Sequence, residues 1–164
     1  MCARWTPAIP LLLAASVACT SGLAAQAPAN ACSLATSEEF QRAHGVNPAI
    51  GILPSAPEYT EVRWGQHCDY PQGAIDLFTS SAELERLLVL VKAPKERTPV
   101  PGLGKRAFFT VAYPGDEYSE RGFLVIDTGS KLVAISMDPD QKEPVSATRP
   151  KLEGLAKLVL PRLK

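Results

Sequence analysis

The chain has 164 residues, with 17 basic and 17 acidic side chains and a formal net charge of +0 at pH 7. A chain of this length favours one folded domain. The charge balance argues against a protein that binds nucleic acid or an anionic membrane through a basic face.

The N-terminus has the layout of a secretory signal peptide. Arg4 precedes an apolar run from Ile9 to Ala18, and small residues follow as far as Ala25. A basic start, a short apolar run and a small-residue cleavage site define such a signal, and the run is shorter than the ~20 apolar residues that span a bilayer. We therefore predict a signal peptide, a short linker and a single α+β domain, over residues 1–25, 26–31 and 32–164.

Cys19 raises the alternative that the N-terminal segment is a lipoprotein signal. It follows Ser16-Val17-Ala18, and a small residue before the cysteine fits a lipoprotein signal, but the usual leucine is absent. If Cys19 is acylated, the lipid is the only membrane contact that we expect. In either case the predicted location is the periplasm, the cell envelope or the extracellular space.

The first elements of the mature chain are predicted to be a short helix and a β-hairpin. Thr36 and Glu39 have the spacing of a capping box, and Gly45 is a natural helix stop. The runs EVRWGQHCDY (61–70) and AIDLFTS (74–80) have the character of strands on either side of a Pro-Gln-Gly turn.

A second helix, three strands and a last helix follow. Residues 81–91 place leucines at helical spacing, and residues 105–113 are typical of a strand. Residues 122–138 contain two β-rich arms around a Thr-Gly-Ser-Lys turn, and residues from about 145 to 163 have one apolar helical face.

The predicted order is therefore α-β-β-α-β-β-β-α. Hairpin connections favour a mainly antiparallel sheet of about five strands. Each helix has one apolar stripe that needs a surface to cover. We therefore expect an α+β two-layer sandwich with the three helices on one face of the sheet.

Cys32 and Cys68 are the only cysteines left after signal cleavage. In an exported chain two cysteines most simply form one disulfide. The alternative is a thiol enzyme or small hydrolase in which His67 or His44 activates Cys68, although adjacent strand residues such as His67 and Cys68 point to opposite faces. A metal site built from the histidines, Cys68 and Asp69 lacks a recognisable ligand spacing, so we expect no metal and no cofactor.

Several segments resemble a family of small bacterial secreted proteins and lipoproteins. They read CSLATSEEFQRAHG, HCDY, VPGLGKRAF, LVAISM and LAKLVLPRL. The family is best known from actinobacterial cell envelopes and is classed as a domain of unknown function. The resemblance implies an envelope location and a Cys32–Cys68 pair, and it brings no activity or catalytic residues.

Two hypotheses about function follow. The first is an exported, disulfide-tied, non-catalytic envelope domain that binds a small ligand or a partner protein, and not nucleic acid. Its candidate ligand-binding residues are the aromatic side chains of Trp64 and Phe109, because helices on one face would leave the other face of the sheet open. The second is the small extracytoplasmic hydrolase or thiol enzyme that uses His67 or His44 with Cys68.

Overall fold

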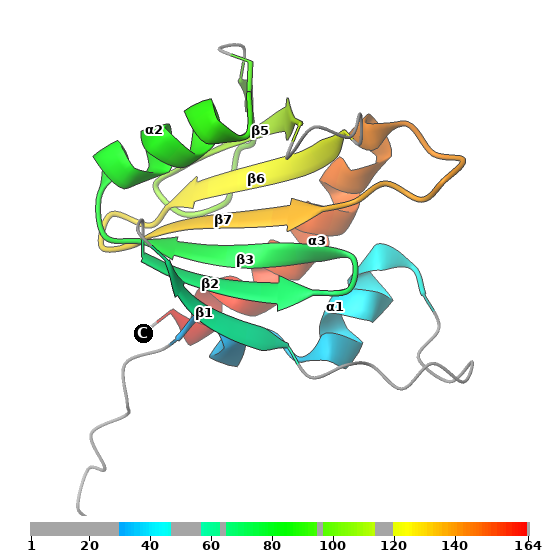
Figure 1. The fold of residues 1–164 in the computed structure, drawn as a ribbon, viewed down its shortest axis with the longest axis horizontal. Coiled ribbons are helices and arrows are strands. Elements are labelled where there is room, and N and C mark those ends of the chain that lie inside the picture. The colour runs from blue at the N-terminus through cyan, green and yellow to red at the C-terminus, as the bar shows by residue number, and fades with distance from the viewer. Residues whose placement is uncertain (1–29, 47–56, 63–64, 95–96, 114–119, 164) are drawn as a thin grey trace, which may run out of the picture.

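The computed structural model describes residues 30–46, 57–62, 65–94, 97–113 and 120–163. The predicted signal peptide, the lipidation candidate Cys19 and the binding candidate Trp64 lie outside these ranges. The described chain forms one sheet in the order β1-β2-β3-β7-β6-β5-β4, with every neighbouring pair antiparallel (Figure 1). The strands are β1 (Glu58–Val62), β2 (Gly65–Tyr70), β3 (Gly73–Phe78), β4 (Thr98–Pro99), β5 (Arg106–Ala112), β6 (Arg121–Asp127) and β7 (Leu132–Met137).

Three α-helices and three short 3-10 turns complete the described fold. The α+β class and the antiparallel sheet are thus confirmed. Helix α1 begins after the predicted capping box, in which the Thr36 side chain accepts from Glu39 N and the Glu39 carboxylate accepts from Thr36 N, and it ends at Gly45 with φ 103°. The helices and turns are η1 (Ala31–Ser33), α1 (Ser37–His44), α2 (Ser81–Leu90), η2 (Val145–Ala147), α3 (Thr148–Val159) and η3 (Leu160–Arg162).

The first predicted strand is two strands. The run over 61–70 folds back on itself, so that Val62 of β1 lies opposite Gly65 of β2. Gly65 has φ 140°, and a Cβ there would collide with the backbone oxygen of Leu77 in β3. Only glycine fits this position, and it ends the alternation that suggested one long strand. The two-residue strand β4 was also missed, because it lies in a proline-rich segment.

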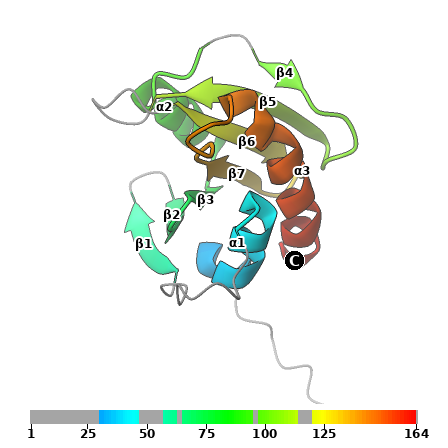
Figure 2. The ribbon, with the colours of Figure 1, turned by 90° about the vertical axis from the view of Figure 1, so that its right-hand side faces the viewer.

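The helices cover both faces of the sheet, which corrects the prediction that all three lie on one face. Figures 1 and 2 show α1 and α3 on one side and α2 on the other. Leu124 and Ile126 of β6 pack in the cluster that includes α1 and α3, whereas Phe123 and Val125 pack with α2. Because side chains alternate along a strand, a run that is apolar at every position has two faces to bury.

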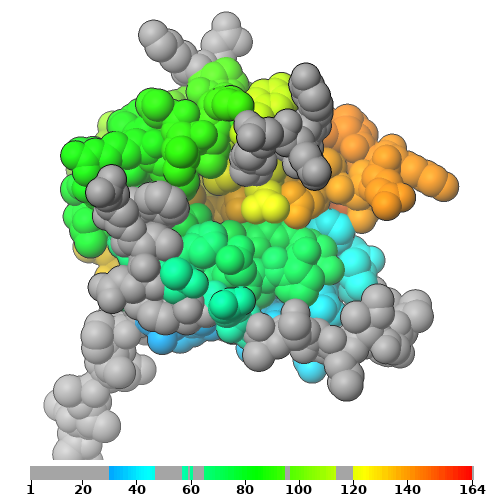
Figure 3. Space-filling model, in the orientation of Figure 1, coloured from blue at the N-terminus to red at the C-terminus, as the bar shows by residue number. Residues whose placement is uncertain are grey.

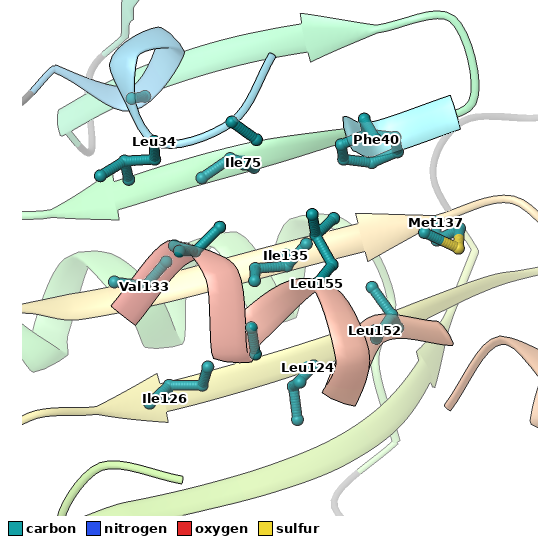
Figure 4. Packing of buried hydrophobic residues seen from close by; sticks show 14 of the residues in the cluster. Leu34, Phe40, Ile75, Leu124, Ile126, Val133, Ile135, Met137, Leu152 and Leu155 are labelled. Atoms are coloured by element: carbon teal, nitrogen blue, oxygen red, sulfur yellow. The ribbon is translucent and has the colours of Figure 1, made fainter. Parts of the chain in front are cut away.

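The larger apolar cluster lies between the sheet and the pair α1 and α3. Figure 4 shows Leu152 and Leu155 of α3 directed at Leu124 and Ile135 of the central strands. All four of these side chains are fully buried. Burial of one such side chain stabilises the fold by roughly 1.5–3 kcal/mol. This cluster has more buried members than the cluster under α2, so it carries most of the described core.

Gly122 of β6 lies close against the start of α3. A Cβ at Gly122 would collide with Thr148 Oγ1 at the start of the helix and would lie 3.1 Å from Phe109 Cε2. We expect Gly122→Ala to lower the free energy of unfolding by about 2 kcal/mol, because either the helix or the strand must shift. Urea denaturation followed by circular dichroism measures this change.

Gly154 provides the matched control for that substitution. It lies inside α3, and a Cβ there meets no atom within 4 Å. Gly154→Ala is therefore expected to raise the free energy of unfolding by roughly 0.5–1 kcal/mol through helix propensity. Equal stability of the Gly122→Ala variant and the wild type would contradict the close approach.

Candidate functional site

Cys32 of η1 and Cys68 of β2 form the predicted disulfide, with Cα atoms 5.2 Å apart. The bond closes a segment with a sequence separation of 36 and fastens the chain before α1 to the sheet. Next to it, the Tyr70 hydroxyl donates to the Ala35 carbonyl at 2.9 Å, and the Tyr70 ring stacks on Phe40 at 4.4 Å. With its sulfur bonded and its side chain fully buried, Cys68 has no thiolate to act as a nucleophile.

His67 lies on the opposite face of β2, between two carboxylates. Its Nδ1 is 2.8 Å from Asp76 Oδ1 of β3, and its Nε2 is 3.0 Å from Asp69 Oδ1. The hydrogen bond to Asp76 is the main reason that the pKa of His67 rises to about 9, against a smaller opposing effect of burial. His67 is therefore an imidazolium at neutral pH, and both of its N–H groups are engaged.

In the Asp69–His67–Asp76 cluster, two carboxylates hold the imidazole in its charged form. An imidazolium with both nitrogens donating has no lone pair with which to accept a proton from a substrate. Ser136 shares this face of the sheet, opposite Ala74 of β3, but it is only 1% exposed and closed to a substrate. The sequence analysis considered His67 and Asp69 but missed Asp76. A carboxylate inside the apolar run of β3 indicates a buried charge that needs a partner.

His44 is the last residue of α1 and is buried, on the side of the sheet that α1 and α3 cover. Its Nε2 is 3.0 Å from the Asp138 carbonyl, and its Nδ1 is 3.6 Å from Asp140 Oδ1. The structure therefore does not bring His44, His67 and Cys68 together. Among the described residues there is no group of three or more His, Cys, Asp or Glu side chains arranged to hold a metal ion.

A hollow of about 250 Å³ lies between the N-terminal half of α2 and the sheet. We call it the α2 groove. In Figure 1 this end of α2 lies beside the arrowhead of β6, and Figure 3 shows the same face of the molecule in space-filling form. The groove is lined by Ser81, Leu84, Glu85, Arg97, Arg106, Phe108, Val125, Asp127 and Leu132.

The floor of the α2 groove is apolar because strand alternation directs Phe108 toward α2. Phe108 packs against the cluster of buried residues under this helix, together with Leu132. Arg97 lies over the Phe108 ring, with Cζ 4.6 Å from its centroid. An aromatic ring and aliphatic side chains under a few placed polar groups are the usual make-up of a ligand site.

The rim of the α2 groove holds two ion pairs. Arg97 donates from Nη1 and Nη2 to the two carboxylate oxygens of Glu85, at 3.0 and 2.8 Å. Arg106 donates from Nη2 to Asp127 Oδ2 at 3.0 Å. Arg106 and a backbone bond from Gly129 hold the pKa of Asp127 below its usual value, and Arg97 does the same for Glu85.

Two further hollows adjoin the α2 groove and share part of its lining. One, of about 310 Å³, continues past Arg106 and Asp127 to the β6–β7 turn. The other, of about 600 Å³, follows the β4–β5 segment from Arg97 to Phe108. Together they extend the site along the end of the sheet on both sides of Arg106.

The structure describes one of the two predicted binding residues. Trp64 lies outside the described residues. Phe109 is 6% exposed and belongs to the cluster that packs against α3, so little of its ring can meet a ligand. Its neighbour Phe108 faces the α2 groove instead, and the alternation of the two rings was visible in the sequence.

The described residues thus form a seven-stranded antiparallel sheet with helices on both faces and a polar-rimmed apolar groove under one helix. No protein-family model, curated protein or solved structure matches the chain. Within the described ranges, each helix is too short or too polar to cross a membrane.

Proposed function

We propose that the protein is an exported, non-catalytic binding module of the bacterial cell envelope, and that the α2 groove is where it binds. The observation that carries the proposal is the combination of an apolar floor, placed arginines and two adjoining hollows at one end of the sheet. Pockets of this composition are the default location for a small ligand or an anchor residue of a partner.

Export is supported by the leader and by the disulfide. Disulfides form and persist in oxidising compartments outside the cytoplasm, and Cys32–Cys68 is bonded. The envelope location follows the resemblance of the chain to small secreted proteins and lipoproteins of bacteria.

A thiol enzyme is the weaker alternative. It requires a Cys68 thiolate and a histidine able to accept its proton, but Cys68 is bonded to Cys32 and His67 holds a carboxylate at each nitrogen. The buried side of β2 carries Cys68 and the other side carries His67, so the two do not face one another.

The proposal predicts that a neutral aromatic probe enters the α2 groove. We expect 1-naphthylmethanol, titrated into the 15N-labelled mature protein, to shift the amide signals of Leu84, Phe108 and Leu132. Phe108→Ala should weaken this binding about tenfold, because the ring supplies apolar contact worth on the order of 1–2 kcal/mol.

Leu158→Ala is the control for this substitution. Leu158 is an exposed apolar side chain of α3, on the other side of the sheet, and its removal should leave the affinity unchanged. Shifts spread evenly over the surface, or equal affinities for the Phe108→Ala variant and the wild type, would count against a binding role for the groove.

A further inference from the structure

The charges around the α2 groove are unevenly placed for a chain whose total charge is balanced. The rim of the groove pairs two arginines with two carboxylates. Among the described residues, the adjoining hollows add Lys105 on one side and Lys131 on the other, and no further acid. The extended site is therefore basic, although the whole chain has 17 basic and 17 acidic residues.

Arg106 is the cation best placed to meet a ligand. Its side chain is 80% exposed, it lines the groove and both adjoining hollows, and its one bond to a described residue is from Nη2 to Asp127. Arg97, by contrast, uses both Nη atoms on Glu85 and rests on Phe108. A free guanidinium edge matches the two oxygens of a carboxylate.

We propose that the ligand of the α2 groove is a small molecule with an apolar body and one carboxylate, and that Arg106 binds the carboxylate. This inference rests on the proposed function. The body of the ligand lies on Phe108 and Leu84, and its carboxylate lies at the junction with the β6–β7 turn, where Lys131 adds to the positive potential. Arg97 is a positioning residue. Its hydrogen bonds to Glu85 keep its guanidinium over the Phe108 ring.

Asp127 competes with the carboxylate of such a ligand for the Arg106 guanidinium. Its Oδ2 accepts from Arg106, and its Oδ1 accepts from Gly129 N at 2.7 Å. Asp127→Asn keeps an oxygen that can accept from Gly129 and removes the negative charge beside Arg106. The variant should therefore bind an anionic ligand more tightly, whereas Arg106→Gln should bind it more weakly.

The test compares two probes with the same ring system, 1-naphthoate and 1-naphthylmethanol, by NMR titration of the mature protein. In the wild type we expect 1-naphthoate to bind about threefold to fivefold more tightly, the range of an exposed charge pair. Added salt should shrink this advantage. Arg106→Gln should abolish the difference in affinity between the two probes, and Asp127→Asn should enlarge it.

Arg149→Gln is the matched control. Arg149 also donates to a carboxylate, that of Glu153 in α3, so this variant removes a paired positive charge on the opposite face of the sheet. It should leave both affinities as in the wild type.

The outcomes separate the two proposals. If both probes bind the wild type equally, or if Asp127→Asn weakens the binding of 1-naphthoate, the carboxylate inference is overturned and the groove remains a binding site. If neither probe shifts the groove signals, the proposed function falls and the inference falls with it.

Discussion

Loss of the Cys32–Cys68 disulfide is expected to lower the free energy of unfolding by about 4 kcal/mol. The bond closes a loop of about 37 residues, and in the chain-entropy account a loop of this size restricts the unfolded chain by that amount. The melting temperature should fall by roughly 10–15 °C when the wild type is treated with a reductant. Differential scanning calorimetry with and without tris(2-carboxyethyl)phosphine measures the change.

The double variant Cys32→Ala/Cys68→Ala separates the cross-link from the packing of the sulfurs. It should melt near the temperature of the reduced wild type and should not respond to reductant. Alanine is the better replacement because Cys68 is fully buried, and a serine hydroxyl there would need a partner. A wild type that melts at the same temperature in both redox states would contradict the prediction.

The ion pair around His67 is expected to make the protein less stable as the pH rises from about 6.5 to about 9. The pKa of His67 is raised from 6.5 to about 9 in the folded protein, chiefly by the hydrogen bond to Asp76. A raised pKa contributes stability that is complete below 6.5 and is lost as the pH passes the folded value. The full shift corresponds to about 3 kcal/mol, and partial exposure of the ring reduces our expectation to about 2 kcal/mol.

Urea denaturation at pH 6 to 9.5 measures this loss, and His67→Gln is its control. Glutamine is uncharged throughout the range, so the variant should start less stable at pH 6 and converge on the wild type toward pH 9.5. The difference between the two curves isolates His67 from other titrating groups. A wild type whose stability is flat over this range, or a variant that shows the same slope, would contradict the assignment of His67 as an imidazolium.

Features with local causes were predictable from the sequence. The capping box of Thr36 and Glu39 and the stop at Gly45 lie within ten residues of one another, and each works through the nearest backbone. The same holds for the turn between β6 and β7, where the Thr128 side chain accepts from Lys131 N at 3.0 Å. The pairing of Cys32 with Cys68 was predictable from the expected export of the chain and from the number of cysteines after the signal peptide, because two cysteines have one way to pair.

The assignment of each helix to one face of the sheet was not predictable from local sequence patterns. The alternation of Phe108 and Phe109 was plain, but their roles depend on α2 crossing to the face opposite α3. A clue was present in β6 and β7, which are apolar at consecutive positions and so indicate burial on both faces. Asp76 likewise signalled a buried charge in β3, but its partner His67 is identified only by the register of β2 against β3.

The sheet lies between two separate apolar clusters, so substitutions in one cluster need not affect the packing of the other. One cluster joins α1 and α3 to the disulfide, and the other lies under α2. Effects of substitutions at separated sites without shared partners usually add. Substitutions among the side chains that shape the α2 groove should therefore change the free energy of unfolding independently of substitutions in the opposite layer.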